Sequence, residues 1–329
     1  MSKAKVWSKI AFIFVKTGNL KKALFFGVLK GGSNIDLVRE FSLKKKTLNH
    51  TPSGRSIHAA NLFIFDNDVS LLKEAFEKFS LDEIHEKVYM SVVKHGKKLK
   101  LQMNSFDGWG AFYEILVKDA YETILDSDFV VVDVGMNVGT AALAFASNDR
   151  VKRVYGFEPV PSSCTMAARN FDLNGAIGDK INITCAALGK GNKIIQIPAA
   201  SGGSVGVSVT GFVMEKIHEP SDYKSTIDVV VKDASTAISE ILQQHNEKIL
   251  LKLDCEGAEY EIIKDLFEQN ILDKIAFIII EWHYNGKSVL VDKLIKSGFI
   301  LFAPDLAFTF PVGLIYGINS SKLVQAKQG

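Results

Sequence analysis

The stretch Phe129–Ala146, "FVVVDVGMNVGTAALAFA", decides the fold. It begins with a β-branched run that is typical of a strand with both faces buried. The run passes Asp133, and then Gly135 and Gly139 follow with Asn137 between them, before a series of small helix-forming residues. A strand that leads through a glycine turn into a helix is a ligand-binding arrangement in parallel sheets. The glycines let the backbone approach a ligand, and the helix begins with free N–H groups.

Apolar strands and amphipathic helices alternate from about residue 105 onward. Continuous runs such as "ILLKLD" and "IAFIIIEW" suit strands covered on both faces, and helical crossovers between them imply a parallel sheet. A helix is predicted over "AFYEILVKDAYETIL", residues 111–125. No helix separates the last two predicted strands, 299–302 and 313–318, so the final strand is expected to run antiparallel.

Residues 1–104 have a less regular pattern. A helix is predicted over Ser70–Phe79, with Ser70 as its N-cap. We therefore expect two parts: a partly helical N-terminal extension, 1–104, and an α/β ligand-binding domain, 105–329. The extension is interpreted as a cap over the substrate pocket or as a membrane-proximal segment.

Composition excludes some classes of function. The 329 residues hold 39 Lys+Arg and 37 Asp+Glu, a net charge of +2, so no nucleic-acid partner is expected. The three cysteines are widely spaced and form no CxxC element, so we expect neither a disulfide framework nor a zinc site. This cysteine usage favours a cytoplasmic protein.

The N-terminus is lysine-rich, with apolar runs at Ile10–Val15 and Ala23–Leu29. Both runs are too short to cross a bilayer of about 30 Å, and neither leads into a signal-peptide cleavage pattern. One interpretation is a pair of short helices packed on the rest of the chain. The other is a basic amphipathic surface that makes peripheral contact with anionic lipid at the inner face of the membrane.

Two acids at strand ends predict a nucleoside cofactor. The spacing Gly-x-x-x-Gly after Asp133 is not the dinucleotide fingerprint, and an acid there suits a cationic ligand better than a pyrophosphate. Glu158, followed by Pro159, ends the next strand, where an acid can hold the two hydroxyls of a ribose. Asp133, Gly135, Asn137, Gly139, Glu158 and Pro159 are the candidate cofactor-binding residues.

Five segments together resemble one enzyme family. The segments "DVGMNVGT", "GFEPVPSS", "NFDLNG", "LKLDCEGAEYEIIK" and "FIIIEWHY" are similar to the FkbM-type S-adenosylmethionine-dependent methyltransferases. The resemblance implies a Rossmann-like class I methyltransferase fold, with a seven-stranded, mostly parallel sheet and an antiparallel last strand. It also implies S-adenosyl-L-methionine as cofactor and O-methylation of a sugar or polyketide hydroxyl. Met136 departs from the family, which usually has alanine there, and Lys232 stands where it tends to have leucine.

The acids and the histidine at two later strand ends are the candidate catalytic residues. Asp254 and Glu256 follow the strand "ILLKLD", and Glu281 and His283 end "AFIIIEWH". A carboxylate or a histidine could remove the proton of an acceptor hydroxyl. Helix capping explains acids at a helix start equally simply, and a histidine beside a tryptophan is often structural. No metal ligand is assigned, although carboxylates around Asp254 could also hold a divalent cation.

Three alternatives to a methyltransferase of small hydroxylated molecules or glycans stay open. An NAD(P)-dependent oxidoreductase would use a similar sheet, but the chain lacks Gly-x-Gly-x-x-Gly. A nucleic-acid methyltransferase would be expected to carry more positive charge. The third alternative is a domain that binds the cofactor without turnover.

Overall fold

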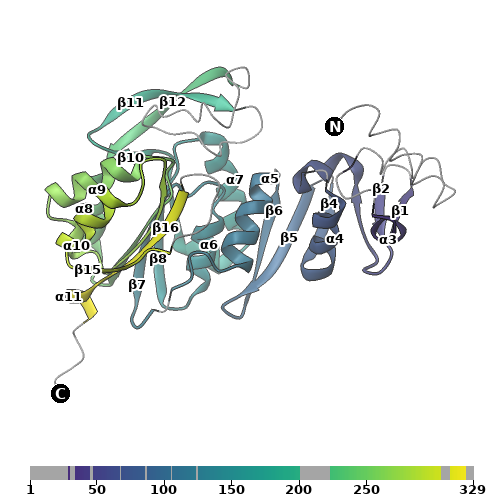
Figure 1. Ribbon diagram of the computed structural model, residues 1–329, viewed down its shortest axis with the longest axis horizontal. Coiled ribbons are helices and arrows are strands. Elements are labelled where there is room, and N and C mark those ends of the chain that lie inside the picture. The colour runs from purple at the N-terminus through teal and green to yellow at the C-terminus, as the bar shows by residue number, and fades with distance from the viewer. Residues whose placement is uncertain are drawn as a thin grey trace. The chain divides into compact units, whose positions relative to one another are not determined.

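The computed structural model describes residue 29 and residues 34–44, 47–66, 68–85, 87–104, 106–123, 125–200, 223–304 and 312–323 (Figure 1). The lysine-rich N-terminal segment lies almost entirely outside these ranges, so its lipid contact stays a prediction. The chain forms two compact units, Met1–Lys118 and Asp119–Gly329. The domain boundary expected after residue 104 also stays a prediction.

A seven-stranded sheet forms the centre of the second unit, in the order β15-β16-β14-β13-β7-β8-β9. Neighbouring strands from β14 through β13, β7 and β8 to β9 are parallel, and β16 is antiparallel to both β14 and β15. This arrangement confirms the expected Rossmann-like class I methyltransferase fold. The strands are β7 (Phe129–Val134), β8 (Val151–Phe157), β9 (Ile181–Thr184), β13 (Lys248–Leu253), β14 (Phe277–His283), β15 (Phe299–Phe302) and β16 (Val312–Asn319).

Helices cover both faces of this sheet. Figure 1 shows α8, α9 and α10 on one face and α6 and α7 on the other. Every residue of β7 and of α6 is buried, which explains their continuous apolar sequences. The helical segments are α6 (Thr140–Ser147), α7 (Pro161–Asp172), η3 (Gly175–Lys180), α8 (Ala234–Gln244), α9 (Glu259–Glu268), η5 (Leu272–Lys274), α10 (Ser288–Lys296) and α11 (Ser320–Leu323).

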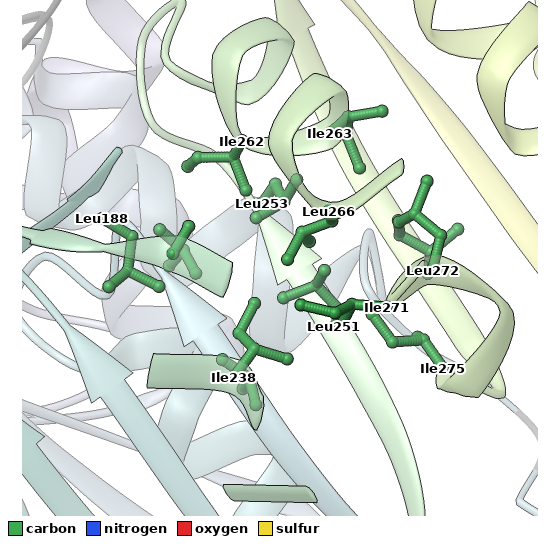
Figure 2. Packing of buried hydrophobic residues seen from close by; sticks show 14 of the residues in the cluster. Leu188, Ile238, Leu251, Leu253, Ile262, Ile263, Leu266, Ile271, Leu272 and Ile275 are labelled. Atoms are coloured by element: carbon green, nitrogen blue, oxygen red, sulfur yellow. The ribbon is translucent and has the colours of Figure 1, made fainter. Parts of the chain in front are cut away.

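The core between β13 and α9 fixes the strand ends that carry the candidate site. Leu251 and Leu253 of β13 pack with Ile262 and Leu266 of α9, and all four side chains are fully buried (Figure 2). At ~25 cal/mol per Å² of apolar surface, such side chains each contribute about 2 kcal/mol to stability. The turn between β13 and α9, which holds Asp254 and Glu256, is therefore held at both ends.

A smaller sheet in the second unit has the order β10-β12-β11. Its strands are β10 (Ala187–Gly189), β11 (Lys193–Ala200) and β12 (Tyr223–Asp233). β12 is parallel to β10 and antiparallel to β11. Asp233 ends β12 and caps α8, because its side chain accepts a hydrogen bond from the backbone N–H of Thr236.

The first unit contains two antiparallel three-stranded sheets, β1-β2-β3 and β4-β5-β6, as well as helices. The predicted helix at Ser70–Phe79 is α4, Val69–Lys78, but its N-cap is Asp68, which accepts from Ser70 N–H. The elements are α3 (Ile35–Arg39), β1 (Phe41–Lys44), β2 (Thr47–His50), β3 (Arg55–His58), η1 (Ala59–Phe65), α4, β4 (Ser80–Ile84), β5 (Lys87–Lys94), β6 (Lys97–Met103), α5 (Phe106–Ala111) and η2 (Phe112–Val117).

Two sequence predictions are wrong. The helix predicted over residues 111–125 ends at Val117, and Tyr121 lies in the irregular segment that follows. Its apolar spacing matches a helix, but Tyr121 is buried by contacts in the second unit. No disulfide framework was expected, but Cys164 of α7 and Cys185 after β9 form one disulfide, with Cα atoms 6.1 Å apart. Folding brings together cysteines whose sequence spacing gives no such signal.

Candidate active site

The glycine turn after β7 is built around close backbone contacts. Gly135 has φ +78°, and a Cβ atom there would lie 1.6 Å from the carbonyl oxygen of Asp254. The N–H groups of Gly135 and Met136 both donate to the carbonyl of Phe157, at 3.0 and 3.1 Å. The ends of β7, β8 and β13 are thus joined at one edge of the sheet, which only glycine at position 135 allows.

Asn137 and Gly139 complete the turn. Asn137 has φ +52°, in the left-handed region that asparagine tolerates better than most residues. Gly139 has φ +85° and precedes α6, and a Cβ atom there would lie 2.4 Å from the ring of Phe171. This backbone geometry explains why the turn after β7 contains two glycines and an asparagine.

Glu158 lies directly beside this turn. Its Oε2 accepts from Asn137 N–H at 3.0 Å and its Oε1 from Val160 N–H at 2.9 Å. The residue is 5% exposed. Burial, only partly offset by the two N–H donors, raises the pKa of Glu158 to about 7. Pro159 is half-buried and lies in the chain between Glu158 and Val160, whose N–H binds the carboxylate.

Asp133 is fully buried and forms an ion pair with Lys252 of β13, whose Nζ lies 2.9 Å from Oδ1. The same Nζ donates to the carbonyl of Gly135 at 2.9 Å. Burial raises the pKa of Asp133, and the charge of Lys252 opposes this shift. Burial alone would lower the pKa of Lys252, but the charges of Asp133 and Asp254 outweigh it and raise the pKa above the ordinary value for lysine. The ammonium group therefore stays charged. Direct contact between Asp133 and a ligand stays a prediction.

Four predicted catalytic residues come together at the ends of β13 and β14. His283 is buried, and its Nε2 lies 3.7 Å from Oε2 of Glu256. The same atom lies 3.9 Å from Oδ1 of Asp254 and 3.9 Å from Oε1 of Glu281. These three carboxylates and the His283 imidazole are called the acid–histidine cluster below.

Glu259 holds the histidine from behind. It is fully buried, and its Oε1 accepts from His283 N–H at 2.7 Å and lies 3.3 Å from Nδ1. Burial opposes the charged imidazolium, but the hydrogen bond to Glu259 and the charge of Glu256 outweigh it and raise the pKa of His283 to about 9. Glu259, the first residue of α9, therefore positions His283.

Two carboxylates of the cluster, those of Asp254 and Glu281, are held by a tyrosine that the sequence analysis did not assign to the site. The hydroxyl of Tyr121 lies 2.7 Å from Oε2 of Glu281 and 3.0 Å from Oδ2 of Asp254, and can donate to either. Burial, with the charge of Asp254 second, raises the pKa of Glu281 to about 7. Burial also raises the pKa of Glu256.

Lys252 and Thr140 are further residues that the sequence reasoning missed. A lysine inside the apolar strand "ILLKLD" was a visible signal, because buried lysines need a partner. Within the described residues, Oδ2 of Asp133 and Oγ1 of Thr140 are buried without a hydrogen-bond partner. Both atoms flank the glycine turn, and unpaired buried polar atoms are uncommon in native proteins.

The sequence model of the methyltransferase FkbM domain matches residues 133–297. This range begins at Asp133, before the glycine turn, and includes His283. The chain belongs to the FkbM methyltransferase family. Within this FkbM range, Met136 departs from the usual alanine, and a Cβ atom on Gly156 of β8 would lie 2.1 Å from its sulfur. The Met136 side chain therefore fills the space that Gly156 leaves by having no side chain.

Individual proteins resemble this FkbM chain more distantly. It is 25% identical over 206 residues to methyltransferase sdnD of Sordaria araneosa, covering 56% of this chain and 79% of that protein. The crystal structure of methyltransferase FkbM from Methylobacillus flagellatus KT is 14% identical, with a TM-score of 0.40. That likeness covers 62% of this chain and 47% of the other, which is less than half. M. capricolum TrmK is 12% identical, with a TM-score of 0.35, covering 62% of this chain and 68% of that one.

Within the described ranges, no helix combines the length and the hydropathy that a bilayer crossing requires.

Proposed function

We propose that the chain transfers a methyl group from S-adenosyl-L-methionine to a hydroxyl of a small molecule or glycan. The observation that carries this proposal is the position of Glu158 beside the glycine turn, at the same sheet edge as the acid–histidine cluster. Burial of the Glu158 carboxylate, which raises its pKa to about 7, costs folding free energy. Residues with pKa values shifted in this way are concentrated at functional sites.

The residues around the turn fit this cofactor. Glu158 can accept hydrogen bonds from the two ribose hydroxyls. The unpaired Oδ2 of Asp133 and Oγ1 of Thr140 offer polar partners for the amino-acid part. S-adenosylmethionine supplies a methyl group that its sulfonium has already activated. Family membership and the absence of Gly-x-Gly-x-x-Gly from the sequence both favour this cofactor over a nicotinamide.

The acid–histidine cluster suits removal of a proton from a hydroxyl. Glu281, with a pKa raised to about 7, can accept a proton near neutral pH. His283, with a pKa raised to about 9, is mainly protonated there while no metal ion is bound, and in that state it fits the role of a hydrogen-bond donor to the acceptor oxygen. The Tyr121 hydroxyl, within hydrogen-bonding distance of both Asp254 and Glu281, holds Glu281 in position. Carboxylates with this spacing also suit the hydroxyl groups of a sugar.

Calorimetric titration of wild type and Glu158→Gln with S-adenosylmethionine and S-adenosylhomocysteine tests the cofactor. We expect wild type to bind both and Glu158→Gln to bind about 10-fold or more weakly, because a charged hydrogen bond contributes roughly 1.5–3 kcal/mol. Glu240→Gln, on the exposed side of α8, is the control and should bind as wild type does. No binding by wild type, or equal binding by Glu158→Gln, contradicts the proposal.

Transfer is tested with labelled S-adenosylmethionine and a panel of sugars and small alcohols. We expect label in an ether product, and much slower transfer by Glu281→Gln with unchanged cofactor affinity. Cofactor binding without turnover of any hydroxylated compound would instead support a non-catalytic domain.

A further inference from the structure

A buried histidine nitrogen at the end of β14 faces three carboxylates without bonding to any of them. The His283 side chain is 5% exposed, and its Nε2 lies 3.7 Å from Glu256 and 3.9 Å from Asp254. Among the described residues, no hydrogen bond to Nε2 is formed. We propose that Asp254, Glu256 and His283 bind a divalent metal ion.

The separations fit a bridging ion better than a direct hydrogen bond. A hydrogen bond between Nε2 and a carboxylate oxygen would measure about 2.7–2.9 Å, whereas the three carboxylates lie 3.7–3.9 Å away. Two ligand atoms about 2.1 Å from a common ion lie roughly 3.0–3.6 Å apart. One ligand atom from each of Asp254, Glu256 and His283 lies within 4.8 Å of the other two. A small contraction of the side chains would therefore complete the inner ligand shell.

Glu259 supplies the support that metal-binding histidines usually have. Its carboxylate lies 3.3 Å from Nδ1 of His283 and is itself fixed by Gly257 N–H, which donates to Oε2 at 2.8 Å. A carboxylate on one ring nitrogen orients the imidazole and turns the lone pair of the other nitrogen toward the metal. The ring is thus aimed at Asp254 and Glu256 before any ion binds.

Charge around the cluster also favours a cation. Lys252 forms ion pairs with the fully buried Asp133 at 2.9 Å and with Asp254 at 3.6 Å, so one ammonium group is shared between two carboxylates. Asp254, Glu256 and Glu281 thus lie close together with this shared ammonium and the His283 imidazole as their cationic neighbours.

A second acid–histidine group in the first unit shows the contrast. Glu40, His50 and Glu77 also lie within metal-binding reach of one another. There the ammonium of Lys73 forms ion pairs with both glutamates, so a protein cation already occupies that group. The acid–histidine cluster has no corresponding lysine within the described part of the second unit that bridges its carboxylates.

The use of the ion rests on the proposed function. A bound cation would lower the pKa of the acceptor hydroxyl, and Glu281 would take the released proton. One imidazole with carboxylates suits Mn²⁺, since carboxylate ligands favour Mg²⁺, Ca²⁺ and Mn²⁺ and imidazole accepts most divalent transition metals.

The test uses Mn²⁺ alone with the full chain after chelator treatment. Calorimetry gives the affinity, and pulsed electron paramagnetic resonance detects a coordinating ¹⁴N nucleus. We expect micromolar binding with ¹⁴N coupling in wild type, and at least 10-fold weaker binding in Asp254→Asn and Glu256→Gln. His283→Gln should lose the ¹⁴N coupling. Asp292→Asn, an exposed acid of α10, is the control and should match wild type.

Wild type that binds no Mn²⁺ below about 1 mM, or binds it without ¹⁴N coupling, overturns the proposal. Equal affinity in the Asp254→Asn and Glu256→Gln variants, with unfolding temperatures like wild type, overturns it too. Titration of the metal-free chain with S-adenosylmethionine separates the two proposals. Cofactor binding without Mn²⁺ binding removes only the metal site, and Mn²⁺ binding without cofactor binding removes only the proposed function.

Discussion

Asp133 and Lys252 are direct neighbours on the parallel strands β7 and β13, and their side chains form a buried ion pair of 2.9 Å. The pair lies beneath the glycine turn, because Lys252 also bonds to the carbonyl of Gly135. It links the strand that leads into the glycine turn to the strand that leads into Asp254.

Lys252→Met is expected to destabilise the protein by ~3–5 kcal/mol, because removing one partner leaves a buried charge without compensation. The double variant Asp133→Asn, Lys252→Met should recover a large part of this loss. Urea denaturation followed by circular dichroism measures both. If the single and the double variant are equally destabilised, the ion pair is not the cause.

Gly135→Ala is expected to prevent folding or to destabilise the protein severely, because its Cβ would overlap the carbonyl of Asp254. Gly191→Ala is a matched comparison, since Gly191 has φ +70° and no atom within 4 Å of the added Cβ. It carries only the backbone strain of a left-handed residue, about 1–2 kcal/mol. Similar unfolding temperatures for the two variants would show that the contact with Asp254 can relax.

Gly156→Ala should destabilise the protein because the added methyl would meet the sulfur of Met136 at 2.1 Å. Adding Met136→Ala, which restores the residue usual in the family, is expected to recover most of the stability. Thermal unfolding of the two single variants and the double variant gives the coupling between the sites. Purely additive effects would mean that Met136 moves aside without cost.

The stability of the cofactor-free protein should depend on pH through Glu158. Its pKa is raised from 4.5 to about 7 in the folded state, so between these values the folded chain binds more protons than the unfolded one. The free energy of unfolding therefore falls as pH rises through this window, by up to about 3 kcal/mol at 1.4 kcal/mol per pKa unit.

Glu158→Gln removes this term while other titrating groups stay the same. We expect the variant to gain stability relative to wild type on going from pH 5 to pH 8. Urea denaturation at both pH values measures the difference. A difference that does not change with pH would mean that Glu158 titrates near its ordinary value.

Local signals predicted the second unit well. The small helix-forming residues that follow the glycine turn after Asp133 form α6, Thr140–Ser147, since the turn marks the start of the helix and small apolar residues continue it. The strand ends that carry Asp133, Glu158, Asp254 and Glu281 were placed from their apolar runs alone. Burial on both faces leaves a strong sequence pattern, and parallel topology gathers the ends of such strands at one edge.

The rest depends on contacts between distant parts of the chain. Tyr121 fits a helical spacing but bonds to Asp254 and Glu281, far along the sequence. The strands β2 and β3 of the first unit have four residues each, too few for a sequence pattern to distinguish a strand from other local structure. The pairing of Cys164 with Cys185 likewise follows from the placement of α7 beside β9, which no spacing rule provides.

Gly135 packs so closely against the carbonyl of Asp254 that a Cβ atom has no room there. This contact limits which substitutions the protein can accept during evolution. Under the proposed function, changes near Asp254 that admit a new acceptor would press on the turn proposed to hold the cofactor, so a wider substrate range there would come with weaker cofactor binding. We therefore expect natural variation in acceptor preference to accumulate in segments remote from this contact.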